Sequence, residues 1–118
     1  MLTKKKTTAM KQYLDKDQTT KLIELGFPKP NSIESVDTEF DGAFAEYIIY
    51  NLRYSIGELI EFLPKEITDE YDEVTSLEFS KTEVYYTNFR VMSYYKNSDE
   101  LIDALFNMCV TLKEEGMI

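Results

Sequence analysis

The sequence predicts an α+β fold with elements in the order α-ββ-α-ββ-α and an antiparallel sheet of about four strands packed against helices. Three observations predict it: an Asp-Gly turn between strand-like segments, a capping-box serine before a helical apolar stripe, and a long amphipathic segment near the end of the sequence. At 118 residues the chain has the size of one domain. We divide it into a basic N-terminal arm, residues 1–16, and a single α+β domain, residues 17–118.

The first helix is expected near residues 17–25. Asp17 is a suitable N-cap, and Gly26 ends the apolar pattern. Lysines dominate the preceding arm, which indicates a tail. Pro28 and Pro30 follow the helix and force extended backbone.

A hairpin is expected next, with strands at 35–40 and 43–54 joined by Asp41-Gly42, the strongest short hairpin signal. The second strand carries apolar residues on both faces. One face holds Phe44, Ile48, Tyr50, Leu52 and Tyr54, with Glu46 as its one charged exception, and the other holds Tyr47 and Ile49. We therefore expect this strand to be covered on both sides and central in the sheet.

Ser55 and Glu58 have the spacing of a capping box, and the helical stripe that follows ends at Pro64. An acidic loop is expected over residues 68–73. Two more strands, 74–79 and 83–95, are expected around a turn at residues 80–82.

The last helix is the clearest element of the sequence. Asn97 is its expected cap, and apolar residues recur at helical spacing from Leu101 to Leu112. The apolar face is wide, so this helix should lie across a sheet and be deeply buried.

Three stretches carry a family resemblance: residues 22–30 (LIELGFPKP), 54–67 (YSIGELIEFLPKEI) and 100–118 (ELIDALFNMCVTLKEEGMI). They resemble small uncharacterised proteins of phages and mobile elements from gut Bacteroidetes. The resemblance covers about a third of the chain and implies a context, the cytoplasm of an infected or element-bearing bacterium. It implies no activity and no site residue.

Residue content argues against most enzyme classes. The chain has no histidine, which removes the commonest general base and zinc ligand. Its single cysteine, Cys109, falls on the apolar face of the last helix, where a buried structural thiol is expected. The acidic run Asp69–Glu73 lacks the spacing and glycine of an EF-hand loop. We predict no cofactor, no metal and no catalytic residue.

Charge is distributed unevenly along the chain. Residues 1–29 carry seven lysines against three acidic residues, a net charge of +4, whereas residues 30–118 carry six basic and nineteen acidic residues, a net charge of −13. Such a body repels phosphates, so direct nucleic-acid binding is disfavoured and basic partners are favoured. One cysteine, and apolar stretches too short to cross a bilayer, favour a cytoplasmic location.

The sequence therefore favours a non-catalytic module whose acidic body binds a protein partner, with nucleic-acid mimicry as a sub-case. Two alternatives stay open: a homo-oligomeric structural or accessory protein, and a carboxylate- or metal-dependent enzyme. The predicted partner-binding residues are the acidic loop and the exposed face of the second hairpin, namely Asp69, Glu70, Tyr71, Asp72, Glu73, Tyr85 and Tyr94.

Overall fold

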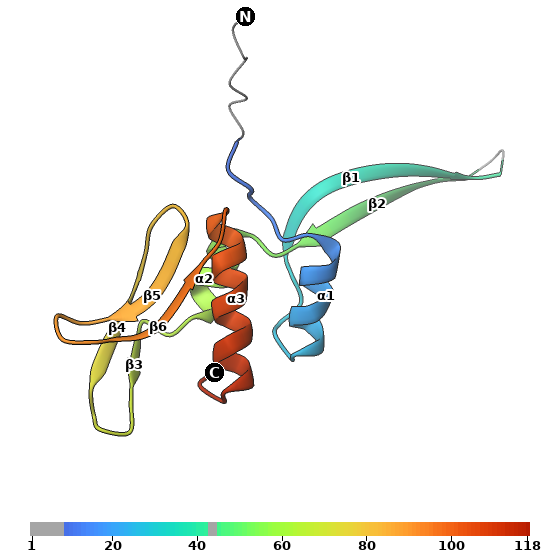
Figure 1. Ribbon diagram of the computed structural model, residues 1–118. Helices are drawn as coiled ribbons and strands as arrows, with labels where there is room; N and C mark the ends of the chain where they lie inside the picture. Colours follow the sequence, from blue (N-terminus) through green and yellow to red (C-terminus); the bar gives the residue numbers. More distant parts are fainter. Residues whose placement is uncertain (1–8, 43–44) are drawn as a thin grey trace, which may run out of the picture.

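The computed structural model describes residues 9–42 and 45–118 and has an α+β fold (Figure 1). Its elements, in chain order, are α1 (Lys16–Glu24), β1 (Ser32–Asp41), β2 (Ala45–Arg53), α2 (Ile56–Phe62), β3 (Glu66–Thr68), β4 (Val74–Phe79), β5 (Glu83–Thr87), β6 (Met92–Asn97) and α3 (Leu101–Glu114). The predicted fold class is confirmed, with a four-stranded antiparallel sheet.

The core lies between the four-stranded sheet and helix α3. The strands pair in the order β3-β4-β5-β6, and α3 lies along the sheet beside α2 (Figure 1). The predicted deep burial of the last helix is confirmed. Its buried residues are Leu101, Ile102, Ala104, Leu105, Met108, Cys109 and Leu112. They form one cluster with Val84 and Tyr86 of β5 and Leu59 of α2, so α2, α3 and the sheet form one body.

The predicted single strand 83–95 is wrong, because a turn divides it into β5 and β6. Asn88 makes that turn: its Oδ1 accepts hydrogen bonds from the backbone N–H groups of Arg90 (2.7 Å) and Val91 (2.9 Å). An asparagine that caps its own turn satisfies backbone donors that would otherwise continue the strand.

Two predicted helix caps are also wrong. Helix α1 is capped by Asp15 rather than Asp17, in a capping box with Gln18. Helix α3 is preceded by Glu100, which makes no side-chain cap, and the predicted cap, Asn97, is instead the last residue of β6. The predicted box of Ser55 and Glu58 at α2 is confirmed.

Part of the predicted N-terminal arm belongs to the body. The Leu14 side chain is buried in the core, and its N–H donates to the Tyr54 carbonyl at 3.0 Å. Lys11 Nζ forms an ion pair with Asp103 of α3 at 2.8 Å. The body therefore begins before residue 17, and residues 1–8 lie outside the described part of the chain.

Strands β1 and β2 form a separate two-stranded sheet that projects from the body (Figure 1). The prediction that the second strand is central and covered on both sides is therefore wrong. The radius of gyration, 18.3 Å, exceeds the roughly 13 Å of a compact chain of this length. Asp41 pairs with Ala45, so the predicted Asp-Gly turn is a longer connection whose residues 43 and 44, including the predicted Phe44, lie outside the described residues.

Candidate protein-interaction surfaces

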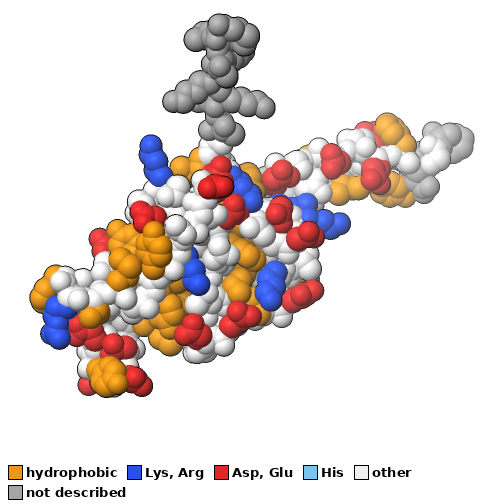
Figure 2. Space-filling view, in the orientation of Figure 1, with side chains coloured by type: hydrophobic (Ala, Val, Ile, Leu, Met, Phe, Trp, Pro, Cys, Tyr) orange, Lys and Arg blue, Asp and Glu red, His pale blue; other side chains and the backbone are white. Residues whose placement is uncertain are grey.

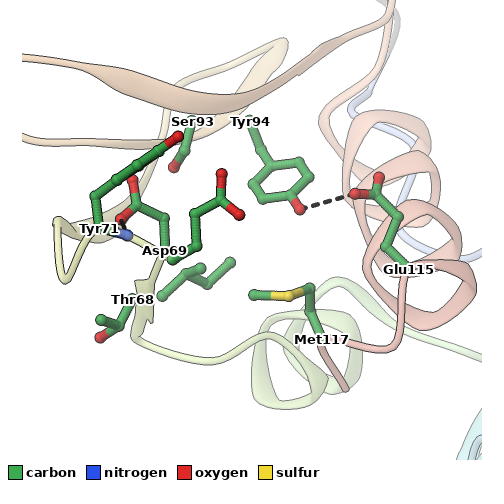
Figure 3. Close-up of a pocket in the computed structure, with 9 residues that line it drawn as sticks. Thr68, Asp69, Tyr71, Ser93, Tyr94, Glu115 and Met117 are labelled. Atoms are coloured by element: carbon green, nitrogen blue, oxygen red, sulfur yellow. Dashed lines mark hydrogen bonds between the residues drawn. The ribbon is translucent and has the colours of Figure 1, made fainter.

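An acidic pocket of about 440 Å³ lies between the loop after β3, strand β6 and the end of α3 (Figure 3). Three of the predicted residues, Asp69, Glu70 and Tyr71, line it. Tyr94, also predicted, lines the same pocket, and its hydroxyl donates to Glu115 Oε1 at 2.9 Å. Burial and this hydrogen bond to Glu115 raise the pKa of Tyr94. The structure thus brings the acidic loop and one strand tyrosine together.

Two carboxylates of the acidic loop bind other groups of the same chain. Asp69 Oδ1 accepts from the backbone N–H groups of Tyr71 (2.8 Å) and Glu73 (2.9 Å). Glu73 Oε1 accepts from Asn88 Nδ2 at 3.1 Å and lies 3.5 Å from Arg90 Nε. Asp72 adopts a left-handed φ of 61° in the same turn and is exposed. Asp69 and Glu73 therefore bind neighbouring groups of the protein.

Tyr85 and Tyr94 do not share a face of the sheet, which corrects the predicted aromatic surface. Tyr94 pairs across the strands with Tyr86, on the side covered by α3. Tyr85 pairs with Tyr95 on the other side, where the two rings stack with centroids 6.4 Å apart. Adjacent positions of a strand point to opposite faces, so Tyr95 rather than Tyr94 is the partner of Tyr85 on the open face.

Cys109 is buried, as expected, and faces α2, where its Sγ lies 3.8 Å from the Leu59 carbonyl oxygen. Burial raises the pKa of this thiol to about 12. A thiol with that pKa is protonated at neutral pH and is a poor nucleophile. Within residues 9–42 and 45–118, no group of three acidic or cysteine side chains is arranged to hold a metal ion.

The β1–β2 hairpin presents a second surface, with one apolar and one polar face. Cross-strand partners share a face, so the pairs Val36–Tyr50 and Thr38–Ile48 lie on one side. We call this side the apolar face; its hydrophobic residues are Ile33, Val36, Phe40, Ile48, Tyr50 and Leu52. On the other side Asn51 donates to Ser35 Oγ (2.9 Å) and Asp37 Oδ2 (2.7 Å).

The apolar face is open to solvent along its length. Phe40 near the tip is 72% exposed, Ile48 59% and Tyr50 56%. Figure 2 shows hydrophobic and acidic side chains along the hairpin, with lysine and arginine side chains where it meets the body. Contiguous exposed apolar surface of this kind marks binding sites in folded proteins.

A β-bulge near the base of β1 extends the apolar face. Ile33 pairs with Leu52 and Ser35 pairs with Asn51, so Glu34 has no partner on β2. In a regular ladder Glu34 would oppose Leu52, and a charge would end the apolar face there. The bulge instead places Ile33 beside Leu52.

Glu58 of α2 fixes the base of the hairpin to the body. Its carboxylate accepts from the Asn31 N–H (3.0 Å), the Ser32 hydroxyl and the Ser55 N–H (3.1 Å). Burial of the carboxyl opposes ionisation, but these hydrogen bonds outweigh it and lower the pKa of Glu58. One side chain thus joins the capping box to the start of β1.

Sequence reasoning missed the apolar face, although its alternation was visible. Ile48, Tyr50 and Leu52 were correctly predicted to share one face, but their strand was assigned to the interior. No family model, curated protein or solved structure matches the chain. None of the helices in the described ranges is long and apolar enough to cross a membrane.

Proposed function

We propose that this chain is a non-catalytic protein-interaction module that binds a protein partner through the apolar face of the β1–β2 hairpin. The observation that carries the proposal is the set of six hydrophobic side chains held on one side of a projecting hairpin. Removing apolar surface from water stabilises a complex by about 25 cal/mol per Å² before the costs of association.

The rest of the molecule supports a binding role. Aromatic side chains such as Phe40 and Tyr50 are typical of the central contacts of interfaces, because they bury a large area with few rotatable bonds. The only cysteine is buried and the sequence has no histidine, so neither supplies a reactive group at the surface. A cytoplasmic location is part of the proposal, supported by the lone unpaired thiol.

The test is capture of partners, with three tagged baits, from a native bacterial lysate to which the untagged chain has been added. The first is the wild type, and the second is Phe40→Ser with Ile48→Ser, which makes the apolar face polar. The matched control is Tyr71→Ser with Phe89→Ser, which removes two exposed aromatics from the body, 82% and 96% exposed. We expect a stoichiometric partner with the first and third baits and its loss with the second. The same partner on all three baits would overturn the proposal.

A further inference from the structure

A second pocket lies at the base of the hairpin, next to the apolar face. It has a volume of about 350 Å³ and lies between α1 and the end of β2. Ile23, Pro30 and Leu52 give it an apolar lining, and Leu52 belongs to the apolar face itself. The apolar face therefore runs from the tip of the hairpin into this basal pocket.

The charged residues that line the basal pocket are all basic: Lys16, Lys29 and Arg53. The hairpin has the opposite charge, because residues 32–52 contain five carboxylates and no lysine or arginine. Glu39 is next to Phe40 in β1, and Glu46 lies opposite Phe40 on β2. The tip is thus an aromatic ring flanked by acids, and the base is an apolar pocket flanked by bases.

The order of residues along the apolar face is also self-complementary. From base to tip the cross-strand pairs are Ile33–Leu52, Val36–Tyr50, Thr38–Ile48 and Phe40–Glu46. When two such faces meet antiparallel, each tip pair reaches the other's base, and Val36–Tyr50 meets Thr38–Ile48. A two-fold interface of this kind contacts the same patch on both subunits.

From this complementarity we infer that the partner on the apolar face is a second copy of this chain. In the dimer the two hairpins lie antiparallel, and Phe40 of each copy enters the basal pocket of the other. Glu46, on the same face as Phe40, then lies against Lys16, Lys29 and Arg53 of the other copy, and Glu39, on the opposite face of β1, adds negative charge at the tip. The inference rests on the proposed function and specifies its partner.

Charge reversal on each side of this contact gives a direct test by sedimentation equilibrium. One variant is Glu39→Lys with Glu46→Lys, and the other is Lys16→Glu with Lys29→Glu; all four side chains are exposed. The wild type should have twice the 13.8 kDa of one chain. Each variant alone places like charges at both contacts and should dimerise at least about 100-fold more weakly.

An equimolar mixture of the two variants should recover the dimer. In the mixed pair the basic tip of one chain meets the acidic pocket of the other, and the acidic tip meets the basic pocket, so both contacts become attractive. The control is Glu66→Lys with Glu78→Lys, at exposed positions of β3 and β4. It changes the net charge by the same amount as Glu39→Lys with Glu46→Lys and should leave the dimer intact. Thermal unfolding of every variant checks that each is folded.

Three results would overturn the inference: a wild type that is monomeric up to about 1 mM, a dimer that resists both reversals, or a mixture that stays monomeric. The proposed function fails separately. A monomeric wild type that captures another protein through the apolar face retains the function and loses the second copy as partner. A monomeric wild type that captures no other protein through the apolar face would contradict both the proposed function and the inference.

Discussion

The β1–β2 hairpin and the β5–β6 hairpin both carry aromatic side chains on antiparallel strands. They differ in whether another element covers those side chains. Tyr86 of β5 is fully buried beneath α3, and its hydroxyl donates to the Pro64 carbonyl at 2.7 Å. Tyr50 of β2 has no helix over it and is 56% exposed. Alternation along a strand thus defines two faces, while burial depends on whether another element packs on one of them.

The difference between the hairpins should be largest in their contributions to the free energy of unfolding. Leu105→Ala in α3 removes a fully buried side chain beneath the β5–β6 hairpin and should cost about 2–5 kcal/mol. Phe40→Ala removes a larger side chain from β1–β2 and should cost no more than about 0.5 kcal/mol in the monomer. Urea unfolding measures both values.

The effect of Phe40→Ala on the free energy of unfolding should be measured in the Lys16→Glu, Lys29→Glu variant, because the inferred dimer is weakened there. If Phe40→Ala lowered the free energy of unfolding of that variant as much as Leu105→Ala does, the hairpin would pack against its own body. The contrast between the two hairpins would then be wrong.

The junction between the hairpin and the body should show a smaller, pH-dependent effect. Glu58→Gln removes the carboxylate that holds Asn31, Ser32 and Ser55, and should cost about 1–2 kcal/mol at pH 7. Because the pKa of Glu58 is lowered in the fold, its stabilisation is present above the ordinary value of 4.5 and is lost as pH falls through the folded pKa. Wild type and variant should therefore converge in acid.

Unfolding curves at a series of pH values test this convergence. The matched control is Glu61→Gln, the same change at an exposed position of α2. A difference between wild type and Glu58→Gln that stays constant into acid would show that the carboxylate does not act through its charge.

The smallest expected effect concerns the loop of the covered sheet. Asp69→Ala leaves the N–H groups of Tyr71 and Glu73 without their acceptor and should cost about 1 kcal/mol. Asp72→Asn, in the same loop, keeps a side chain that tolerates left-handed backbone and should change stability by less than about 0.5 kcal/mol. Equal losses in thermal unfolding would contradict the shaping role of Asp69.

Local signals in the sequence predicted most of the individual elements. The capping box at Ser55, the burial of α3 and the limits of β4 are confirmed, because the pattern that predicts each lies within one short stretch of sequence. The division of residues 83–95 was missed because Asn88 ends the strand by capping its own turn, and no glycine or proline marks the position.

Arrangement in space was harder to predict than the elements. A strand with apolar residues on both faces is typical of a central strand, and that rule led to the wrong place for β2. The acidic loop with Tyr71 stays a predicted binding site, and its sequence did not indicate that Asp69 and Glu73 bind neighbouring groups of the protein. The basal pocket combines residues of α1, the proline segment and β2, and no single stretch of sequence contains that combination.

The bulge at Glu34 also determines which changes of length the gene can tolerate. Loss of the codon for Glu34 would restore a regular ladder in which Ile33 still opposes Leu52 and Ser35 still opposes Asn51. Loss of the codon for Asp37 would instead let Glu34 rejoin the ladder and exchange Ser35 and Val36 between the faces. Within β1, deletion of codon 34 thus leaves both faces of the hairpin unchanged.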